Sequence, residues 1–232
     1  RTGVPISAAR QSAPLVNFRR EARDDYGSDF EYGDEEAGSD YGVEFFDREH
    51  PELLDAARRI LSTETVHIGA VGLGSAVAVI GEDGRPQQQV QWHTDGGPDA
   101  QQVSFRTALD RHDTSNAPLR VLPGSQNRLP DEVADELLQL ELATGTHDET
   151  PEMCFARHPH EVEVVLDPRW TLVWTPSTWH ATGVKTAAGP RRAMGWNYYP
   201  AGGRTRDLEA LKHIHPGWSD WPEDRQRLWG LV

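Results

Sequence analysis

The stretch QWHTDGG, residues 91–97, follows the polar strand that QQQVQWH predicts, and it ends in two glycines. Residues two apart on a strand face the same side of the sheet, so His93 and Asp95 can point into one cavity, with Gln91 beside them. An imidazole and a carboxylate on one face can bind a metal ion, although a polar turn at a strand end has the same composition. A third ligand elsewhere in the chain decides between these two interpretations.

Short strand-like segments separated by turn residues make up most of the chain after residue 65. Six stretches concentrate β-branched, aromatic and small apolar residues, namely VHIGAVGLGSAVAVIG, VSFRTALD, LRVLPGS, VEVVLD, TLVWTP and RAMGWNYY. Helical spacing of apolar residues predicts helices over 50–62 and 131–143, and a short helix is expected near 207–213. Many short strands with few helices predict a mainly β fold, a double-stranded β-helix of the jelly-roll or cupin-like type with flanking α-helices.

Acidic residues are concentrated near the N-terminus. Between Glu21 and Glu49 there are twelve acidic residues and two basic ones, mixed with Gly and Ser and without a hydrophobic period. Such a composition disfavours a packed core. We expect residues 1–45 to be an acidic, weakly ordered segment, either a surface tail or a lid, and residues 46–232 to form one double-stranded β-helix domain.

The overall composition excludes several classes of partner. The net charge is −14, so the protein should repel the phosphate backbone of nucleic acids. No apolar run approaches the roughly 18 residues that span a bilayer. The single cysteine, Cys154, rules out an intrachain disulfide, and the glycines at 69, 72 and 74 lack the spacing of nucleotide-binding loops. We therefore expect a cytoplasmic protein that binds neither nucleic acid nor a membrane, and we make no prediction of its oligomeric state.

His180 is the strongest candidate for a third ligand. It follows an apolar strand and a Pro-Ser-Thr turn in TLVWTPSTWHATG. His67 is predicted to be a core residue, and the remaining histidines lie in polar, loop-like or C-terminal contexts. Two histidines and one carboxylate on one face of an iron ion leave positions open for a 2-oxo acid and O2, which is the arrangement of non-haem Fe(II) oxygenases.

A 2-oxo dicarboxylic acid also needs a fixed cation for its second carboxylate. Arg191 lies eleven residues after His180, at the start of the strand that RAMGWNYY predicts. The planar guanidinium of arginine can bind a carboxylate through two parallel hydrogen bonds. Arg192 competes for this role, since only one of two neighbouring strand residues faces inward. A solvated strand edge is the alternative for both arginines.

Three ordered stretches resemble the phytanoyl-CoA dioxygenase (PhyH) family of Fe(II)- and 2-oxoglutarate-dependent oxygenases. They are QWHTDGG, TALDRHDTSNAPLRVLPGSQ and HATGVKTAAGPRRA, which fall within residues 50–200. The resemblance implies that His93, Asp95 and His180 bind iron. It also implies that Arg191 binds the distal carboxylate of 2-oxoglutarate.

The same resemblance places further residues near the cosubstrate. It implies that the Thr182 hydroxyl lies beside the distal carboxylate. Gln91 shares the predicted strand face with His93, so it can contact the cosubstrate or the substrate. Arg106 stands where the family commonly has tryptophan. It can add a second cation to the cosubstrate pocket, bind an acidic substrate or form a structural salt bridge. Gln126 replaces a common histidine, and the acidic segment has no counterpart in the family.

The resemblance implies an enzyme that converts 2-oxoglutarate and O2 to succinate and CO2 while oxidising a C–H bond of a small molecule, with ascorbate in support. Asp95 favours hydroxylation over halogenation, because related halogenases have a small residue at the carboxylate position. Desaturation and ring formation stay open. So do a peptide or protein side-chain hydroxylase on the same fold and a non-catalytic metal- or ligand-binding barrel. The acidic composition favours a neutral or cationic substrate.

Overall fold

Two β-sheets and several short helices organise the described part of the chain. The structure, a computed structural model, describes residues 16–19, 49–74, 92–143, 153, 155–168, 170–202 and 208–232. The strands are β1 (Val16–Arg19), β2 (Val66–Gly74), β3 (Val103–Ala108), β4 (Leu119–Val121), β5 (Val162–Val164), β6 (Trp170–Trp174), β7 (His180–Thr182) and β8 (Ala193–Pro200). The α-helices are α3 (Pro51–Leu61), α4 (Pro130–Gln139), α6 (Leu208–Ile214) and α7 (Glu223–Leu228), and the 3-10 helices are η1 (Ser125–Asn127) and η2 (Trp218–Asp220).

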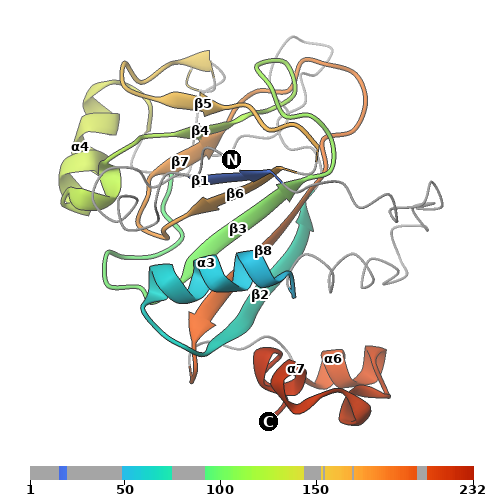
Figure 1. Cartoon of the computed structure of the whole chain (residues 1–232). Coiled ribbons are helices and arrows are strands. Elements are labelled where there is room, and N and C mark those ends of the chain that lie inside the picture. Colours follow the sequence, from blue (N-terminus) through green and yellow to red (C-terminus); the bar gives the residue numbers. More distant parts are fainter. Residues whose placement is uncertain are drawn as a thin grey trace. The chain divides into compact units, whose positions relative to one another are not determined.

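Strands that are neighbours in the two sheets are mostly far apart in the sequence. The larger sheet has the order β1-β6-β3-β8-β2 and the smaller sheet the order β5-β4-β7 (Figure 1). Most neighbouring strands are therefore not consecutive in the chain, as is typical of jelly-roll sheets. In the smaller sheet β4 pairs antiparallel with both neighbours, and Val121 lies opposite His180. The mainly β prediction with few helices is confirmed.

The described part of the N-terminal segment is strand β1. It pairs antiparallel with β6, and Val16 lies opposite Val173. No strand is predicted before residue 45, because VNFR is too short to show a clear alternation next to its polar neighbours. The acidic run after residue 20 lies outside the described residues up to position 48, so the division of the chain near residue 45 stays a prediction.

The first of two compact units carries two apolar clusters. It contains β1 and the described residues of 74–100 and 106–193. One cluster joins β3, β4, β5 and β6, and its buried members are Ala108, Leu119, Val121, Val164, Leu166, Leu172 and Trp174. The other joins α4 to β7 and to the segment before His93, and its members are Trp92, Leu122, Val133, Leu137, Leu142 and Ala181. Because side chains alternate along a strand, burial of Ala181 leaves His180 and Thr182 on the opposite face of β7.

Helix α4 is shorter than predicted. It begins at Pro130, a residue suited to a first helical turn, and Val133 and Leu137 bury one side of it. The predicted end at residue 143 is wrong, because the helix ends at Gln139 and Glu141 adopts a left-handed conformation with φ of 55°. None of the helices in the described part of the chain has the length and apolar character that a membrane span requires.

The second unit contains the described residues of 21–73, 101–105 and 194–232. Phe105 stacks on Trp196, with ring centroids 5.5 Å apart. Gly69 has no room for a side chain, since a Cβ would lie 2.0 Å from the Tyr199 ring. At the C-terminal end, the indole N–H of the fully buried Trp229 donates to a Glu49 carboxylate oxygen at 2.7 Å. Ring packing and this hydrogen bond therefore hold the unit together.

Candidate metal centre and its buried arginines

The two histidines that the sequence singled out are paired through their backbones. His93 and His180 form an isolated antiparallel bridge, and each backbone N–H donates to the other's carbonyl oxygen at 3.0 Å. Residues directly opposite in an antiparallel pair point their side chains to the same face. The two rings accordingly lie close together, with centroids 4.3 Å apart. His93 lies outside the named strands, so this bridge rather than a long strand fixes its position.

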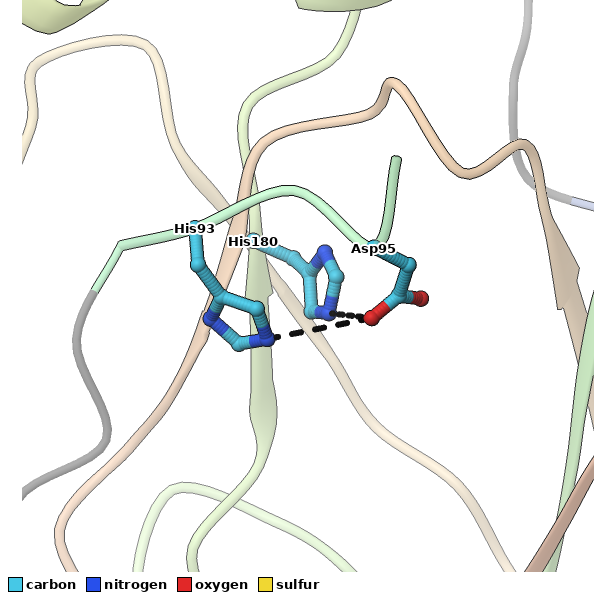
Figure 2. A group of neighbouring side chains, drawn as sticks. All are labelled: His93, Asp95 and His180. Carbon is cyan, nitrogen blue, oxygen red and sulfur yellow. Dashed lines mark ion pairs between the residues drawn. The ribbon is translucent and has the colours of Figure 1, made fainter. Parts of the chain in front are cut away.

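Asp95 completes the cluster from the turn that follows His93. The backbone N–H groups of Asp95 and Gly96 both donate to the Pro176 carbonyl oxygen, at 2.8 and 3.1 Å. Asp95 Oδ1 lies 3.9 Å from His93 Nε2 and 3.8 Å from His180 Nε2, and the three side chains converge (Figure 2). Among the described residues, this is the one group of three or more such side chains whose ligand atoms all lie within 4.8 Å of one another.

Two further hydrogen bonds set which atoms face the cluster centre. His180 Nδ1 lies 2.9 Å from the Thr178 carbonyl oxygen, to which it can only donate, so the lone pair is on Nε2. The indole N–H of Trp174 donates to Asp95 Oδ2 at 3.0 Å, which leaves Oδ1 for the histidine side. Partners of this kind orient the ligands of metal sites and raise their basicity.

The donor set fits a divalent iron ion. Two imidazole nitrogens and one carboxylate oxygen match the two-histidine, one-carboxylate set that leaves adjacent coordination positions open. The three ligand atoms lie within 4.8 Å of one another, so these side chains could hold one ion together. The His180 side chain is 4% exposed and that of His93 is 44% exposed, so the cluster opens on the His93 side. Burial, followed by the nearby His93, lowers the pKa of His180 to about 4, which keeps it in the neutral form that binds metals.

Arg191 presents a buried hydrogen-bond donor without an acceptor. The residue is 3% exposed, and its Nε–H donates to the Ala117 carbonyl oxygen at 3.0 Å. Ala117 has a left-handed backbone with φ of 48°, as residues in tight turns do. Nη2 of Arg191 is buried and has no hydrogen-bond partner among the described residues. Burial, and then repulsion from Arg106, lowers the pKa of Arg191 to about 10, so the side chain is cationic at neutral pH.

Arg192, the competing arginine, is already paired. Its Nε and Nη2 donate to the two oxygens of Asp110 at 2.8 and 2.7 Å, and its backbone N–H donates to the same carboxylate. A bidentate pair of this kind satisfies the guanidinium. Of the two neighbours, Arg191 is therefore the one with a donor available for a ligand.

Arg106, on β3, lies beside Trp174, the residue that donates to Asp95. Its guanidinium carbon lies 5.6 Å from the centre of the Trp174 ring, within the range of a cation–π contact. Burial lowers the pKa of Arg106, and the negative charge of Asp95 partly offsets this effect. Thr182 follows two residues after His180 on β7 and is half-buried on the same face. Gln91 lies outside the described residues.

Comparison with known protein families matches residues 11–193 to the phytanoyl-CoA dioxygenase (PhyH) family. The chain belongs to this family. PhyH proteins are non-haem iron- and 2-oxoglutarate-dependent oxygenases, so the resemblance noted in the three sequence stretches is confirmed. Among curated proteins, none matches the chain significantly.

Several solved structures have a similar fold. The carbocyclase SnoK from nogalamycin biosynthesis is 16% identical with a TM-score of 0.57, and the match covers 84% of this chain and 83% of SnoK. EctD from S. alaskensis with bound Fe is 17% identical with a TM-score of 0.56, over 87% of this chain and 78% of EctD. EvdMO1 is 18% identical with a TM-score of 0.53, over 84% of this chain. These likenesses confirm the jelly-roll prediction.

The chain is shorter than some of the proteins it matches. The match covers 48% of the length of EvdMO1 and 61% of the length of AviO1 from Streptomyces viridochromogenes.

The sequence did not reveal the residues that support this PhyH site. The apolar strand TLVWTP predicts that Trp174 is a core residue. Its hydrogen bond to Asp95 joins positions 79 apart, which no local pattern indicates. The sequence could have suggested that the indole N–H of Trp174 has a hydrogen-bond acceptor, because buried tryptophans usually do. Thr178 and Ala117 act through backbone carbonyls, so their side chains carry no signal.

Proposed function

We propose that the protein is a non-haem Fe(II)- and 2-oxoglutarate-dependent dioxygenase that hydroxylates a C–H bond of a small molecule. The observation that carries the proposal is the cluster of His93, Asp95 and His180, whose ligand atoms lie within 4.8 Å of one another. Arg191 supports it, since its buried and unpaired Nη2 suits a carboxylate of the cosubstrate.

Each residue of the cluster has a defined part in this proposal. His93 Nε2, His180 Nε2 and Asp95 Oδ1 would hold the iron. Bound iron would supply the redox chemistry that couples conversion of 2-oxoglutarate and O2 to succinate and CO2 with oxidation of the substrate. The Thr178 carbonyl keeps the proton of His180 on Nδ1, and Trp174 keeps Asp95 from rotating away.

The cosubstrate would lie between this cluster and Arg191. Arg191 would bind the distal carboxylate through its fork, and the hydroxyl of Thr182, on the ligand face of β7, would add a hydrogen bond. Burial of Arg191 strengthens such a pair because little water competes for it. Gln91 keeps the role that the family resemblance implies, a contact to the cosubstrate or the substrate.

Hydroxylation is the proposed outcome because Asp95 occupies the carboxylate position of the metal site, which in related halogenases is left to a halide. SnoK, whose name indicates ring formation, has the same fold at 16% identity. Product analysis by mass spectrometry separates the two outcomes, since hydroxylation adds one oxygen atom and ring formation removes two hydrogens.

We also infer that the protein acts in the cytoplasm on a small molecule and binds neither nucleic acid nor a membrane. The net charge of −14 and the single cysteine support this inference.

The proposal is tested by adding Fe(II) and 2-oxoglutarate to the protein without oxygen. We expect a visible absorption band that neither addition gives alone, and succinate once air and ascorbate are admitted. The alternative of a non-catalytic barrel predicts neither. A protein that gives the band and releases succinate with peptides but not with small molecules would instead support the peptide hydroxylase.

A further inference from the structure

Arg106 is a second cation of the site, with a charge that its surroundings leave unbalanced. Among the described residues, no carboxylate lies within ion-pair distance of its guanidinium. The carboxylate whose charge raises the pKa of Arg106 against the effect of burial is Asp95. Both oxygens of that carboxylate are engaged, since Oδ1 faces the two histidines and Oδ2 accepts the Trp174 indole N–H.

A half-buried guanidinium without a counter-ion costs free energy unless a ligand supplies the opposite charge. Arg106 also repels Arg191, whose pKa falls partly for that reason. The side chain is not fully enclosed, because its exposure is intermediate. Its fork is held over the Trp174 ring, so little side-chain entropy is lost when a ligand binds.

The cosubstrate alone does not balance this charge. In the proposed oxygenase site, the charges of a divalent iron, Asp95, Arg191 and a doubly charged 2-oxoglutarate cancel, and both histidine ligands are neutral. Arg106 then leaves one positive charge beside Asp95. A carboxylate on the substrate would make the assembled site neutral, and a phosphoryl group would more than offset the remaining charge. Either pairing favours binding in a site from which water is excluded.

We propose that Arg106, held over Trp174, binds an oxyanion group of the substrate, a carboxylate or a phosphoryl group. This inference rests on the proposed oxygenase function and names the class of its substrate. It replaces the neutral or cationic substrate that the overall composition favours. Twelve of the acidic residues behind that expectation lie between positions 21 and 49, far in sequence from the metal ligands, whereas Arg106 is next to Trp174 and Asp95.

The test uses matched small probes on the protein loaded with Fe(II) and 2-oxoglutarate without oxygen. Benzoate and phenyl phosphate carry an oxyanion, whereas benzamide has nearly the same shape as benzoate and no charge. Their dissociation constants are measured by calorimetry and by perturbation of the visible band. We expect the wild-type protein to bind the anions at least about tenfold more tightly than benzamide.

Two variants and one control separate charge from structure. Arg106→Gln should remove the preference for anions, and Arg106→Lys should keep part of it, because lysine keeps the charge but lacks the fork. Arg59→Gln removes one positive charge from the exposed surface of α3 and should leave the preference unchanged. Thermal unfolding of each variant shows that it is folded.

Three outcomes would overturn the inference. One is equal binding of anions and benzamide by the wild-type protein, and another is an undiminished preference in Arg106→Gln. The third is a loss of 2-oxoglutarate affinity in Arg106→Gln as large as in Arg191→Gln, which would assign Arg106 to the cosubstrate. If no visible band forms in the wild-type protein, the proposed function itself fails. If the band forms without anion preference, only the present inference fails.

Discussion

Two arginines of the first unit lie over tryptophans near the candidate metal cluster, but their charges are balanced differently. Arg120 lies 5.2 Å from the centre of the Trp92 ring, and its Nε and Nη2 donate to the two Glu161 oxygens at 3.0 and 2.6 Å. Arg106 lies over Trp174 with no such carboxylate among the described residues. Similar packing thus supports two purposes: Arg120 closes an internal ion pair, whereas Arg106 and Arg191 keep hydrogen-bonding capacity for a ligand.

Burial also affects the acid partner in the Arg120 pair. Burial by itself raises the pKa of Glu161, but the Arg120 hydrogen bonds and charge outweigh it and hold the pKa below its usual value. The pair is therefore charged at neutral pH and contributes to the folded state. Arg106 and Arg191 have no such partner and contribute no comparable stability. Removal of Arg120 should therefore lower stability and leave ligand binding intact, whereas removal of Arg106 or Arg191 should lower ligand binding and leave stability intact.

The largest expected effect is on folding, from Arg120→Met. The change removes the buried cation of Glu161 and leaves only the half-exposed Arg157, 2.8 Å from Glu161 Oε1, as its partner. The loss should cost about 3 kcal/mol of unfolding free energy, at the low end for a broken buried pair. Urea unfolding followed by tryptophan fluorescence measures it. Arg191→Gln serves as the matched variant, and its metal-free form should be as stable as the wild type or more so. Equal losses in both variants would contradict the distinction between the two classes.

The next effect is on cosubstrate binding, from Arg191→Ala. Loss of the buried cation should weaken 2-oxoglutarate binding at least about thirtyfold. Fe(II) binding should change little, because Arg191 is not one of the proposed iron ligands. Titration of the visible band measures both. Arg192→Gln is the control and should change 2-oxoglutarate affinity only slightly, because its guanidinium binds Asp110. The reverse result would move the assignment to Arg192.

A third effect concerns pH and the buried His112. Burial, followed by the charge of Arg191, lowers the pKa of His112 to about 4. The unfolded chain, with an ordinary histidine pKa of about 6.5, therefore takes up the proton first as the pH falls. Stability is complete above pH 6.5 and should fall by about 2 kcal/mol by pH 5. Urea unfolding across this range should give a flatter profile for His112→Gln; an unchanged profile would assign the loss to other groups.

The smallest effect separates the two tryptophans. Trp174→Phe keeps the ring packing but removes the hydrogen bond to Asp95 Oδ2, so metal affinity should fall about tenfold. Trp92→Phe is the control, because the Trp92 indole nitrogen is buried without a hydrogen-bond partner among the described residues. Competition with a metal-chelating dye measures both affinities. A similar loss in both variants would show that packing, not the hydrogen bond, supports the site.

Sequence patterns predicted the residues of the candidate site more readily than the residues that support them. Two-residue spacing predicted that His93 and Asp95 share a strand face, whereas the structure brings Asp95 to the cluster from a turn that its backbone N–H fixes on Pro176. The same cluster contains His180. Their proximity depends on the His93–His180 backbone bridge, which joins positions 87 apart. Such pairing is a property of the folded topology, and no local pattern encodes it.

The arginines show the same limit. Spacing after His180 reduced the choice to Arg191 and Arg192, but strand alternation alone could not say which faces inward. Asp110 settles their orientation by binding Arg192, and this pairing spans 82 positions. The end of α4 was missed for a local reason, since the left-handed conformation of Glu141 is uncommon for a non-glycine residue.

The His93–His180 bridge also bears on how the protein acquires metal during synthesis. A growing chain in which only His93 and Asp95 have left the ribosome offers two ligands on one short loop, which is a weak and unselective chelator. His180, the third ligand of the proposed site, follows Asp95 by 85 residues and is brought into place by the two backbone hydrogen bonds to His93. Closing a loop of that length is opposed by chain entropy until the surrounding sheets have formed. Tight metal binding would then require the folded protein. A nascent or misfolded chain would release the ion and would not hold it in a reactive site with only two ligands.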